Sequence, residues 1–419
     1  MTDRPAVVPA LPAVRTARRA ARAVLAVMLV VVIAAACTPS TDEPTASAST
    51  PRPTARATAV PTPEPTAVPT PSPTPEPTPV PTPTPVAAVS NGVWIPADKA
   101  EIATRHPIAV MIDDAAAARP QSGLAQADVF YQALAEGGIP RYMAIFQVGD
   151  PPAVGPVRSA RRYYVGWAKE WRALYAHAGG APNALAAIRQ ANRRTLWDAD
   201  QFRFGNTLYR VGFRFAPHNV YSTGKKLRAL GRRLGATAPF TKPLWTFKEP
   251  ADLAERPVGG SISVPYRANR ISYRYDREKD RYIRGVSGVK TQKDGTTKAV
   301  VAPSNVIVLF MGTGALGNDQ FSRNNVRKHR IDIDYIGTGK ALVFRDGQAI
   351  KATWSKAKEN APTRILYAGG PDKGKPVPLV RGQIAIQVVP RSTNVTWKLG
   401  KPAPPPTAPT PPPVPERAL

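Results

Sequence analysis

Ile108-Ala109-Val110-Met111-Ile112 is a run of five apolar residues that ends directly at the carboxylates Asp113-Asp114. A short apolar run that includes β-branched residues and stops at polar ones is typical of a buried strand. We therefore expect a strand at 108–112 that leads into a polar loop.

The chain on the C-terminal side of this run mixes strand and helix signals. Two apolar stretches separated by Glu136-Gly137-Gly138 predict a pair of strands joined by a glycine turn. Ser159 precedes aromatic residues at helical spacing, so we expect it to cap a helix. The expected strands are 129–134, 141–148 and 174–177, and the expected helices begin at 159, 183 and 223.

The second half of the folded part is rich in strand signals and poor in helix signals. Residues 261–266 and 271–275 alternate between apolar and polar at period two. Further strands are expected at 305–311, 331–335, 341–344, 350–354 and 384–389. We predict an α+β protein with a mixed α/β N-terminal domain at 91–245 and a β-rich C-terminal domain at 246–398.

Cys37 is the only cysteine in the chain, and it closes an apolar run at 23–36 that follows a cluster of arginines. This order is typical of a secretory signal, and Ile33-Ala-Ala-Ala-Cys37 resembles a bacterial lipobox. We predict a signal peptide at 1–36 and lipidation of Cys37. Two alternatives are an ordinary cleavage site and an uncleaved anchor, although the run is shorter than the roughly 20 residues that a spanning helix needs. All three place the folded part outside the cytoplasm.

Residues 37–90 form a linker dominated by Pro, Thr, Ala and Ser, in which the string at 61–71 nearly repeats at 73–83. Repeated proline favours polyproline II, which rises about 3.1 Å per residue. The linker is therefore either a stalk that holds the folded part away from the membrane or a passive disordered connection. A second Pro-rich, disordered tail is expected at 399–419.

The chain carries 57 Lys and Arg against 29 Asp and Glu, a formal net charge of +28. Such an excess attracts anionic surfaces and polymers. For an exported protein, envelope anions are more plausible partners than nucleic acid, which we do not expect. The alternative is a general surface bias toward arginine with no specific anion as partner.

Several uncommon strings occur in order along the first half of the folded part. They are 108–113, Arg119-Pro-Gln-Ser-Gly-Leu124, Ala135-Glu-Gly-Gly138, Gly155-Pro-Val-Arg-Ser-Ala-Arg161, His177-Ala-Gly-Gly180 and Pro217-His-Asn-Val-Tyr221. Together they resemble the YerB-like family of bacterial surface lipoproteins. The resemblance implies the two-domain architecture and the location, but it supplies no reaction. This sequence departs from the family pattern at Asp114, where the family has Asn, and at Pro140, which interrupts the glycine turn.

Polar residues gather where the predicted strands end, which is where α/β folds usually build their sites. Asp113, Glu136 and His177 each lie at or just after a strand end, and Arg158 and Arg161 lie in a loop that enters a helix. Guanidinium groups beside a helix N-terminus favour an anion such as phosphate or carboxylate. The alternative is that these arginines pair internally with Asp113, Glu136 or Asp128.

His218 follows Pro217 just before the next helix, where it could act as a base, orient a ligand or simply lock the loop. The predicted ligand-binding residues are Asp113, Glu136, Arg141, Arg158, Ser159, Arg161, His177, His218, Asn219 and Tyr221.

These residues support two functions of different classes. The preferred one is a membrane-tethered lipoprotein that binds an anionic envelope component or small anionic ligand in its N-terminal domain. The alternative is an envelope hydrolase that acts on glycan or peptidoglycan through Glu136 or Asp113 with His177 or His218. The sequence contains no HExxH motif, P-loop or Gly-x-Ser-x-Gly elbow, and we predict neither a metal nor a cofactor.

Overall fold

The computed structural model describes residues 83–316 and 329–403. The predicted signal peptide, Cys37, nearly all of the linker and most of the C-terminal tail lie outside these residues.

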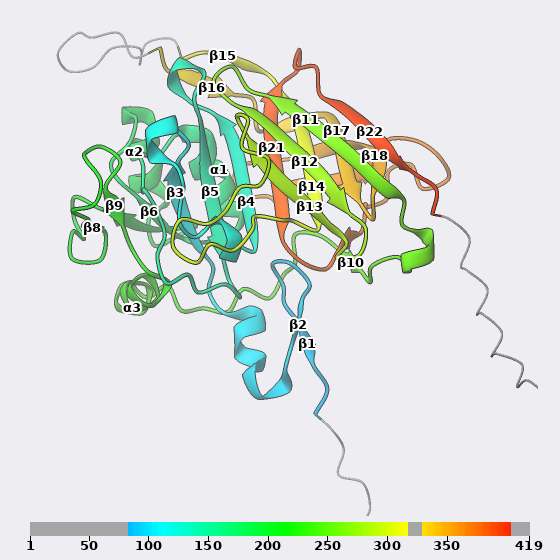
Figure 1. Cartoon of the computed structure of the whole chain (residues 1–419). Coiled ribbons are helices and arrows are strands. Elements are labelled where there is room, and N and C mark those ends of the chain that lie inside the picture. The colour runs from blue at the N-terminus through cyan, green and yellow to red at the C-terminus, as the bar shows by residue number, and fades with distance from the viewer. Residues whose placement is uncertain (1–82, 317–328, 404–419) are drawn as a thin grey trace, which may run out of the picture. The chain divides into compact units, whose positions relative to one another are not determined.

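One ten-stranded sheet runs through both halves of the chain in the order β19-β18-β17-β14-β21-β4-β5-β3-β6-β7 (Figure 1). Its strands are β19 (Arg364–Tyr367), β18 (Gln348–Lys356), β17 (Gly337–Arg345), β14 (Asn305–Met311), β21 (Ile384–Pro390), β4 (Val129–Leu134), β5 (Pro140–Phe146), β3 (Ile108–Asp113), β6 (Leu174–His177) and β7 (Trp197–Asp200). The halves join where β21 lies parallel to β4, with Ile386 opposite Tyr131. The two predicted domains therefore share one sheet.

Most of the strands follow the sequence signals. β3 is buried along its whole length, as the apolar run at 108–112 predicts. Pro140 does not break the hairpin, because it is the first residue of β5 and pairs with Leu134. With few helices and many strands, the α+β prediction is confirmed.

Different layers cover the two faces of the ten-stranded sheet. Helices α1 (Arg162–Glu170) and α2 (Pro182–Ala191) pack on one face, and α3 (Gly224–Leu234) packs on the other. A four-stranded sheet shares the face of α3, in the order β13-β12-β11-β22 (Figure 1). Its strands are β11 (Val258–Pro265), β12 (Arg270–Asp276), β13 (Arg281–Val286) and β22 (Thr396–Lys401).

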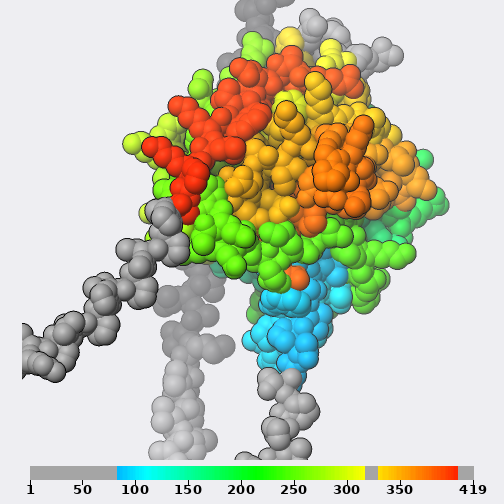
Figure 2. All heavy atoms as spheres, turned by 90° about the vertical axis from the view of Figure 1, so that its right-hand side faces the viewer, coloured from blue at the N-terminus to red at the C-terminus, as the bar shows by residue number. Residues whose placement is uncertain are grey.

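The remaining elements are short. Two-stranded pairs are formed by β1 (Val86–Ala87) with β2 (Trp94–Ile95), β8 (Tyr209–Arg210) with β9 (Val220–Tyr221), β10 (Phe247–Lys248) with β20 (Leu379–Val380), and β15 (Thr313–Ala315) with β16 (Ile331–Ile333). The short 3-10 helices are η1 (Ala97–Thr104), η2 (Ala116–Ala118), η3 (Leu124–Gln126), η4 (Glu136–Gly138) and η5 (Leu253–Glu255). In Figure 2 a green band of chain separates most of the C-terminal half, yellow to red, from the blue segment that carries β1, β2 and η1.

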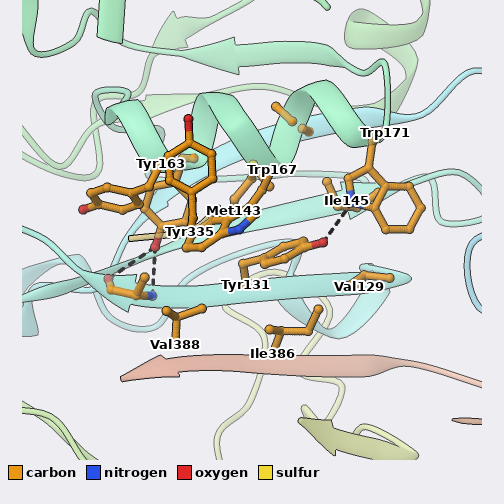
Figure 3. Close-up of a cluster of buried hydrophobic side chains, with 14 of the residues drawn as sticks. Val129, Tyr131, Met143, Ile145, Tyr163, Trp167, Trp171, Tyr335, Ile386 and Val388 are labelled. Carbon is orange, nitrogen blue, oxygen red and sulfur yellow. Dashed lines mark hydrogen bonds between the residues drawn. The ribbon is translucent and has the colours of Figure 1, made fainter. Parts of the chain in front are cut away.

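Aromatic residues of α1 fill the core beneath that helix. Figure 3 shows Tyr163, Trp167 and Trp171 projecting from the helix region toward Tyr131 and Met143 of the sheet. The Trp167 ring stacks on Tyr131 with centroids 5.3 Å apart, and the indole nitrogen of Trp171 donates to the Tyr131 hydroxyl at 3.1 Å. All of these side chains are fully buried, so they supply much of the apolar area that holds α1 on the sheet.

Two of the predicted helix starts are correct, and one is wrong. Thr223 caps α3, because its side-chain oxygen accepts from the backbone N–H of Lys226 at 3.1 Å, and α2 begins within one residue of its predicted start. Ser159 does not cap α1, which begins at Arg162 with Arg161 as its N-cap. The segment before α1 is held in extended backbone by pairing with neighbouring strand ends, and this pairing overrides the local helix signal.

Every helix among residues 83–316 and 329–403 is too short or too polar to cross a bilayer.

Candidate functional site

Strand ends bring several of the predicted site residues to one edge of the ten-stranded sheet. β3 and β6 are parallel, and β3 and β4 are both antiparallel to β5. Asp113 ends β3, His177 ends β6 and Glu136 comes just after β4, so all three lie at the same edge. Arg141 is the second residue of β5 and lies opposite Asp113. This grouping is the one that the sequence predicts.

The arginine-bearing loop lies directly on this edge. The backbone N–H of Asp113 donates to the carbonyl of Pro156 at 2.9 Å, and that of Arg158 donates to the carbonyl of Met111 at 3.0 Å. Further along, the N–H of Ala160 donates to the carbonyl of Gly179 at 2.9 Å. The loop is thus fixed by backbone bonds, which places the side chains of Arg158, Ser159 and Arg161 over the strand ends.

Glu136 is held by two guanidinium groups. Arg161 donates to both of its carboxylate oxygens at 2.5 Å, and Arg141 lies 3.4 Å from the second oxygen. Burial alone would raise the pKa of Glu136, but the bonds and charges of Arg161 and Arg141 outweigh it and lower that pKa. Burial, together with the positive charge of Arg161, lowers the pKa of Arg141 to about 10. The positive charge here therefore exceeds what Glu136 alone can balance.

Asp113 forms a second charged group at the same edge. Its Oδ2 lies 2.9 Å from Nε of Arg158 and 2.7 Å from Nδ1 of His218. The His218 side chain is about one-fifth exposed, with 22% of its area accessible to solvent. Asp113 thus orients an imidazole ring that solvent can reach.

Three predicted residues make their contacts elsewhere. His177 is fully buried, with Nε2 3.0 Å from Asp198 Oδ1 and Nδ1 2.9 Å from the carbonyl of Gly179. Asn219 accepts from Arg210 at 2.7 Å. Tyr221 is buried, and its ring lies against the Phe213 ring with centroids 5.4 Å apart.

A hollow of about 320 Å³ opens beside the Glu136 group. Its lining comprises Glu136, Ser159, Arg161, Gly180, Ala181 and Arg330. Helices α1 and α2 both begin at its wall, and neither N-cap residue, Arg161 or Ala181, provides a side-chain cap. The N-terminal ends of these helices carry partial positive charge, so arginines and helix dipoles together favour an anion in this space.

Sequence reasoning missed Arg330, Gly180 and Ala181 as lining residues. Arg330 lies in the other half of the chain, far from the predicted loop, and no local pattern marks it. Gly180 and Ala181 follow directly after the predicted strand at His177, so the rule that sites form at strand ends could have included them.

A second buried polar cluster, also missed, surrounds Asp114. Its carboxylate accepts from Gln132 at 2.7 Å, Asn269 at 2.8 Å and Tyr142 at 3.1 Å. Arg284 is fully buried and donates to Gln132 at 2.7 Å and to Tyr142 at 3.0 Å. Gln132 and Tyr142 thereby bridge the two charges. Asp114 can make these bonds because all of its partners are donors.

No cluster of three or more His, Cys, Asp or Glu side chains within the described ranges is arranged to hold a metal ion.

Comparisons with known proteins agree with this architecture. Residues 94–237 match the model for "Protein of unknown function (DUF3048) N-terminal domain", and residues 262–386 match the DUF3048 C-terminal domain. A curated relative from Bacillus subtilis (strain 168), "Putative lipoprotein YerB", is 32% identical over 297 residues, which cover 69% of this chain and 83% of the relative. A crystal structure of YerB from the same species matches with a TM-score of 0.62 and 27% identity, covering 74% of this chain and 99% of that one. The resemblance to the YerB-like family is confirmed.

Proposed function

This chain belongs to the YerB-like family with DUF3048 domains, and we propose that it is an exported lipoprotein, anchored at Cys37, that binds an anionic group at the edge of its sheet. The lipid anchor is supported by the lipobox-like string at 33–37 and by the name of the relative. An acylated cysteine with a Pro-rich linker would hold the folded part outside the cytoplasm, at the membrane surface.

An excess of positive charge beside an open hollow carries the binding proposal. Arg141, Arg158 and Arg161 lie close enough for their charges to interact, and among the described residues their ion-pair partners are the two carboxylates Glu136 and Asp113. Arg330 adds a further guanidinium at the wall of the hollow. A phosphate or carboxylate in this space would offset the remaining charge and could accept an N–H donor from Arg161. The ligand class is therefore an anion of an envelope component or a small anionic molecule.

Ser159→Asp tests this proposal by adding a carboxylate to the wall of the hollow. Ser159 Oγ lies 3.1 Å from Nη1 of Arg161, so the new carboxylate would compete with the ligand for that guanidinium. We expect affinity for inorganic phosphate, and retention on purified cell-wall material, to fall at least about tenfold, which corresponds to about 1.4 kcal/mol. Isothermal titration calorimetry with phosphate and a pull-down of wall fractions measure the two effects.

Ser261→Asp is the matched control, because it adds the same charge on an exposed strand position in the C-terminal half. Its binding should equal that of the wild type. Equal binding by Ser159→Asp and Ser261→Asp would contradict a site at Ser159 and leave only a general attraction of anions to a basic surface.

The contact between Asp113 and His218 favours a second candidate, an envelope hydrolase. A carboxylate that orients a partly exposed imidazole can support general base catalysis. Glu136 and His177 fit this role less well, because Glu136 is bonded to two arginines and His177 is buried. This alternative expects turnover of a glycan or peptidoglycan substrate that falls at least about a hundredfold in His218→Gln. A substrate screen in which the wild type releases no product would remove its support.

A further inference from the structure

Three phenylalanine side chains are the most exposed large apolar groups among the described residues. Phe202 is 74% exposed, Phe213 73% and Phe215 92%, while the next in order, Val289, is 55% exposed. Single apolar residues scattered over a surface are normal, but a group of nearly bare aromatic rings marks an interaction surface. Phe202 comes two residues after β7, and the other two lie in the loop between β8 and β9, at the left of Figure 1.

Both phenylalanine-bearing segments are joined to the arginine-bearing loop. The Phe202 ring lies against Gly179, where an added Cβ would meet it at 3.0 Å, and the carbonyl of Gly179 accepts from the N–H of Ala160 at 2.9 Å. The carbonyl of Val220 in β9 accepts from the N–H of Val157 at 2.7 Å. The three phenylalanines therefore belong to the same edge of the ten-stranded sheet.

The loop between β8 and β9 is fastened to the rest of the fold. At its base, the N–H of Val211 donates to the carbonyl of Asn219 at 2.8 Å. In its middle, the Arg214 guanidinium donates to the carbonyls of Ala117 at 3.0 Å and Pro120 at 2.9 Å. The phenylalanines on both sides of Arg214 are thus presented to solvent by a fixed backbone, so the loop loses little conformational entropy when these rings bind a partner.

The chain around these rings is strongly basic. Residues 201–248 contain ten Lys and Arg and no Asp or Glu. The carboxylates of the adjoining strand β7, Asp198 and Asp200, are mostly buried, with 10% and 16% of their side chains exposed, although Asp198 lies 3.5 Å from Arg203. The exposed basic residues closest in sequence to the phenylalanines are Arg203, Arg210, Lys225 and Lys226.

Lys226 connects the start of α3 to this surface, since its Nζ lies 5.5 Å from the centre of the Tyr209 ring in β8. Exposed phenylalanines among basic side chains are the residue types with which proteins bind anionic membranes. The rings enter the boundary between headgroups and acyl chains, and the cations attract the lipid phosphates. The charge of this surface therefore favours an anionic bilayer over a neutral one.

We propose that Phe202, Phe213 and Phe215, with the basic side chains around them, dock the folded part on a bilayer that contains anionic phospholipids. This inference rests on the proposed anchor for bringing the folded part to a membrane, and it does not depend on the hollow beside Glu136. Residues 38–82 separate Cys37 from the described part of the chain. A fully extended chain of this length spans on the order of 100 Å, so the anchor leaves this surface free to reach the membrane.

Spin labelling at position 215 tests this surface in the mature, acylated protein held in vesicles by its anchor. Acylation consumes the thiol of Cys37, the only cysteine of the chain, so Phe215→Cys provides a single site for a nitroxide. In vesicles of phosphatidylcholine with phosphatidylglycerol, we expect the label to be accessible to oxygen, which dissolves in the bilayer, and shielded from a water-soluble nickel complex. In vesicles of phosphatidylcholine alone we expect the reverse. Val289→Cys is the matched label position, because Val289 is an exposed apolar residue of the C-terminal half, and its label should stay in water in both kinds of vesicle.

Lys225→Glu with Lys226→Glu, added to the labelled protein, tests the role of charge. New carboxylates in the first turn of α3 suit the helix dipole, so the fold should be kept. The ratio of bilayer-exposed to water-exposed label at position 215 should fall at least about tenfold in anionic vesicles. Lys290→Glu with Lys293→Glu makes the same change of charge at exposed positions of the C-terminal half and should leave that ratio within about twofold.

A label at position 215 that stays in water in anionic vesicles would overturn the proposal. So would insertion that is equal in the two kinds of vesicle, or that Lys225→Glu with Lys226→Glu leaves unchanged, because anionic lipid would then play no part. Uptake of the nitroxide by the wild type would instead reveal a free thiol at Cys37 and contradict the anchor. The difference between the spectra of Phe215→Cys and the wild type would still decide whether position 215 enters the bilayer.

Discussion

Replacing Lys356 with Met should lower the free energy of unfolding by about 3–5 kcal/mol, because it leaves a buried carboxylate without its partner. Lys356 and Glu170 are both fully inaccessible to solvent, and Nζ lies 3.0 Å from Oε2. An ionised carboxylate that loses its counter-charge inside a protein keeps its desolvation cost and loses the attraction that offset it. Urea unfolding followed by tryptophan fluorescence measures the change.

Glu170 accepts further hydrogen bonds, and these hold its carboxylate in the core. It accepts from the Tyr131 hydroxyl at 2.9 Å, and from the backbone N–H and hydroxyl of Thr363 at 2.7 and 2.9 Å. These contacts join α1 and β4 of the N-terminal half to the C-terminal half. Loss of the ion pair between Lys356 and Glu170 should therefore destabilise both halves together. We expect unfolding to remain a single transition.

The double variant Glu170→Gln with Lys356→Met is the control. It removes both charges, so we expect it to recover part of the stability that Lys356→Met alone loses. If Lys356→Met unfolds at the same urea concentration as the wild type, the pair does not hold the two halves together.

A neighbouring group of ion pairs also joins α1 to the C-terminal half, nearer the surface. Glu359 accepts from Lys169 at 2.5 Å and from the Tyr335 hydroxyl at 2.9 Å, and it also pairs with Arg162. Burial alone would raise the pKa of Glu359, but these partners lower it to about 2. Lys169 and Arg162 belong to α1, so the start and the end of this helix are both tied to the C-terminal half.

The sequence predicts individual strands well because their signals are local. The buried β3 and the hairpin of β4 and β5 follow directly from apolar runs and a glycine turn. The parallel pairing of β21 with β4 joins residues on the order of 250 positions apart, and no local pattern encodes it. The predicted helix start at Ser159 fails for the same reason, since distant strand ends hold that segment extended.

The candidate site could be predicted only as far as its strand ends. The rule places Asp113, Glu136 and His177 at one edge, and they lie there. It cannot say which arginine pairs with which carboxylate, nor that His177 turns toward Asp198. Arg330 reaches the hollow only through the fold of the second half.

Replacing Arg284 with Met should also cost about 3–5 kcal/mol of unfolding free energy at neutral pH. Arg284 is fully buried among the rings of Phe130, Tyr142 and Tyr273, at 5.9, 5.3 and 5.9 Å. The positive charge of Arg284 lowers the pKa of Asp114 and so counteracts burial, which raises that pKa. The variant leaves Asp114 with Arg119 as its remaining ion-pair partner, at 3.3 Å.

The unfolding free energy lost in Arg284→Met should depend on pH in the direction expected if Asp114 is the group that titrates. Burial raises the pKa of Asp114 above its ordinary value, although the charges of Arg284 and Arg119 oppose this. A carboxyl with a raised folded-state pKa favours the folded state at low pH, and that contribution disappears as the pH rises through the folded-state pKa. Without Arg284 the folded-state pKa rises further. The stability difference between wild type and Arg284→Met should therefore be largest near pH 7 and shrink toward pH 4.

Urea unfolding at a series of pH values measures this difference, and two further variants locate its cause. Arg274→Met removes an exposed arginine from β12 and should leave stability nearly unchanged. Asp114→Asn combined with Arg284→Met has no carboxyl to titrate at this position, so its stability relative to Asp114→Asn should not vary with pH. A loss in Arg284→Met that is constant from pH 4 to pH 7 would mean that packing, rather than the charge on Asp114, is what Arg284 provides.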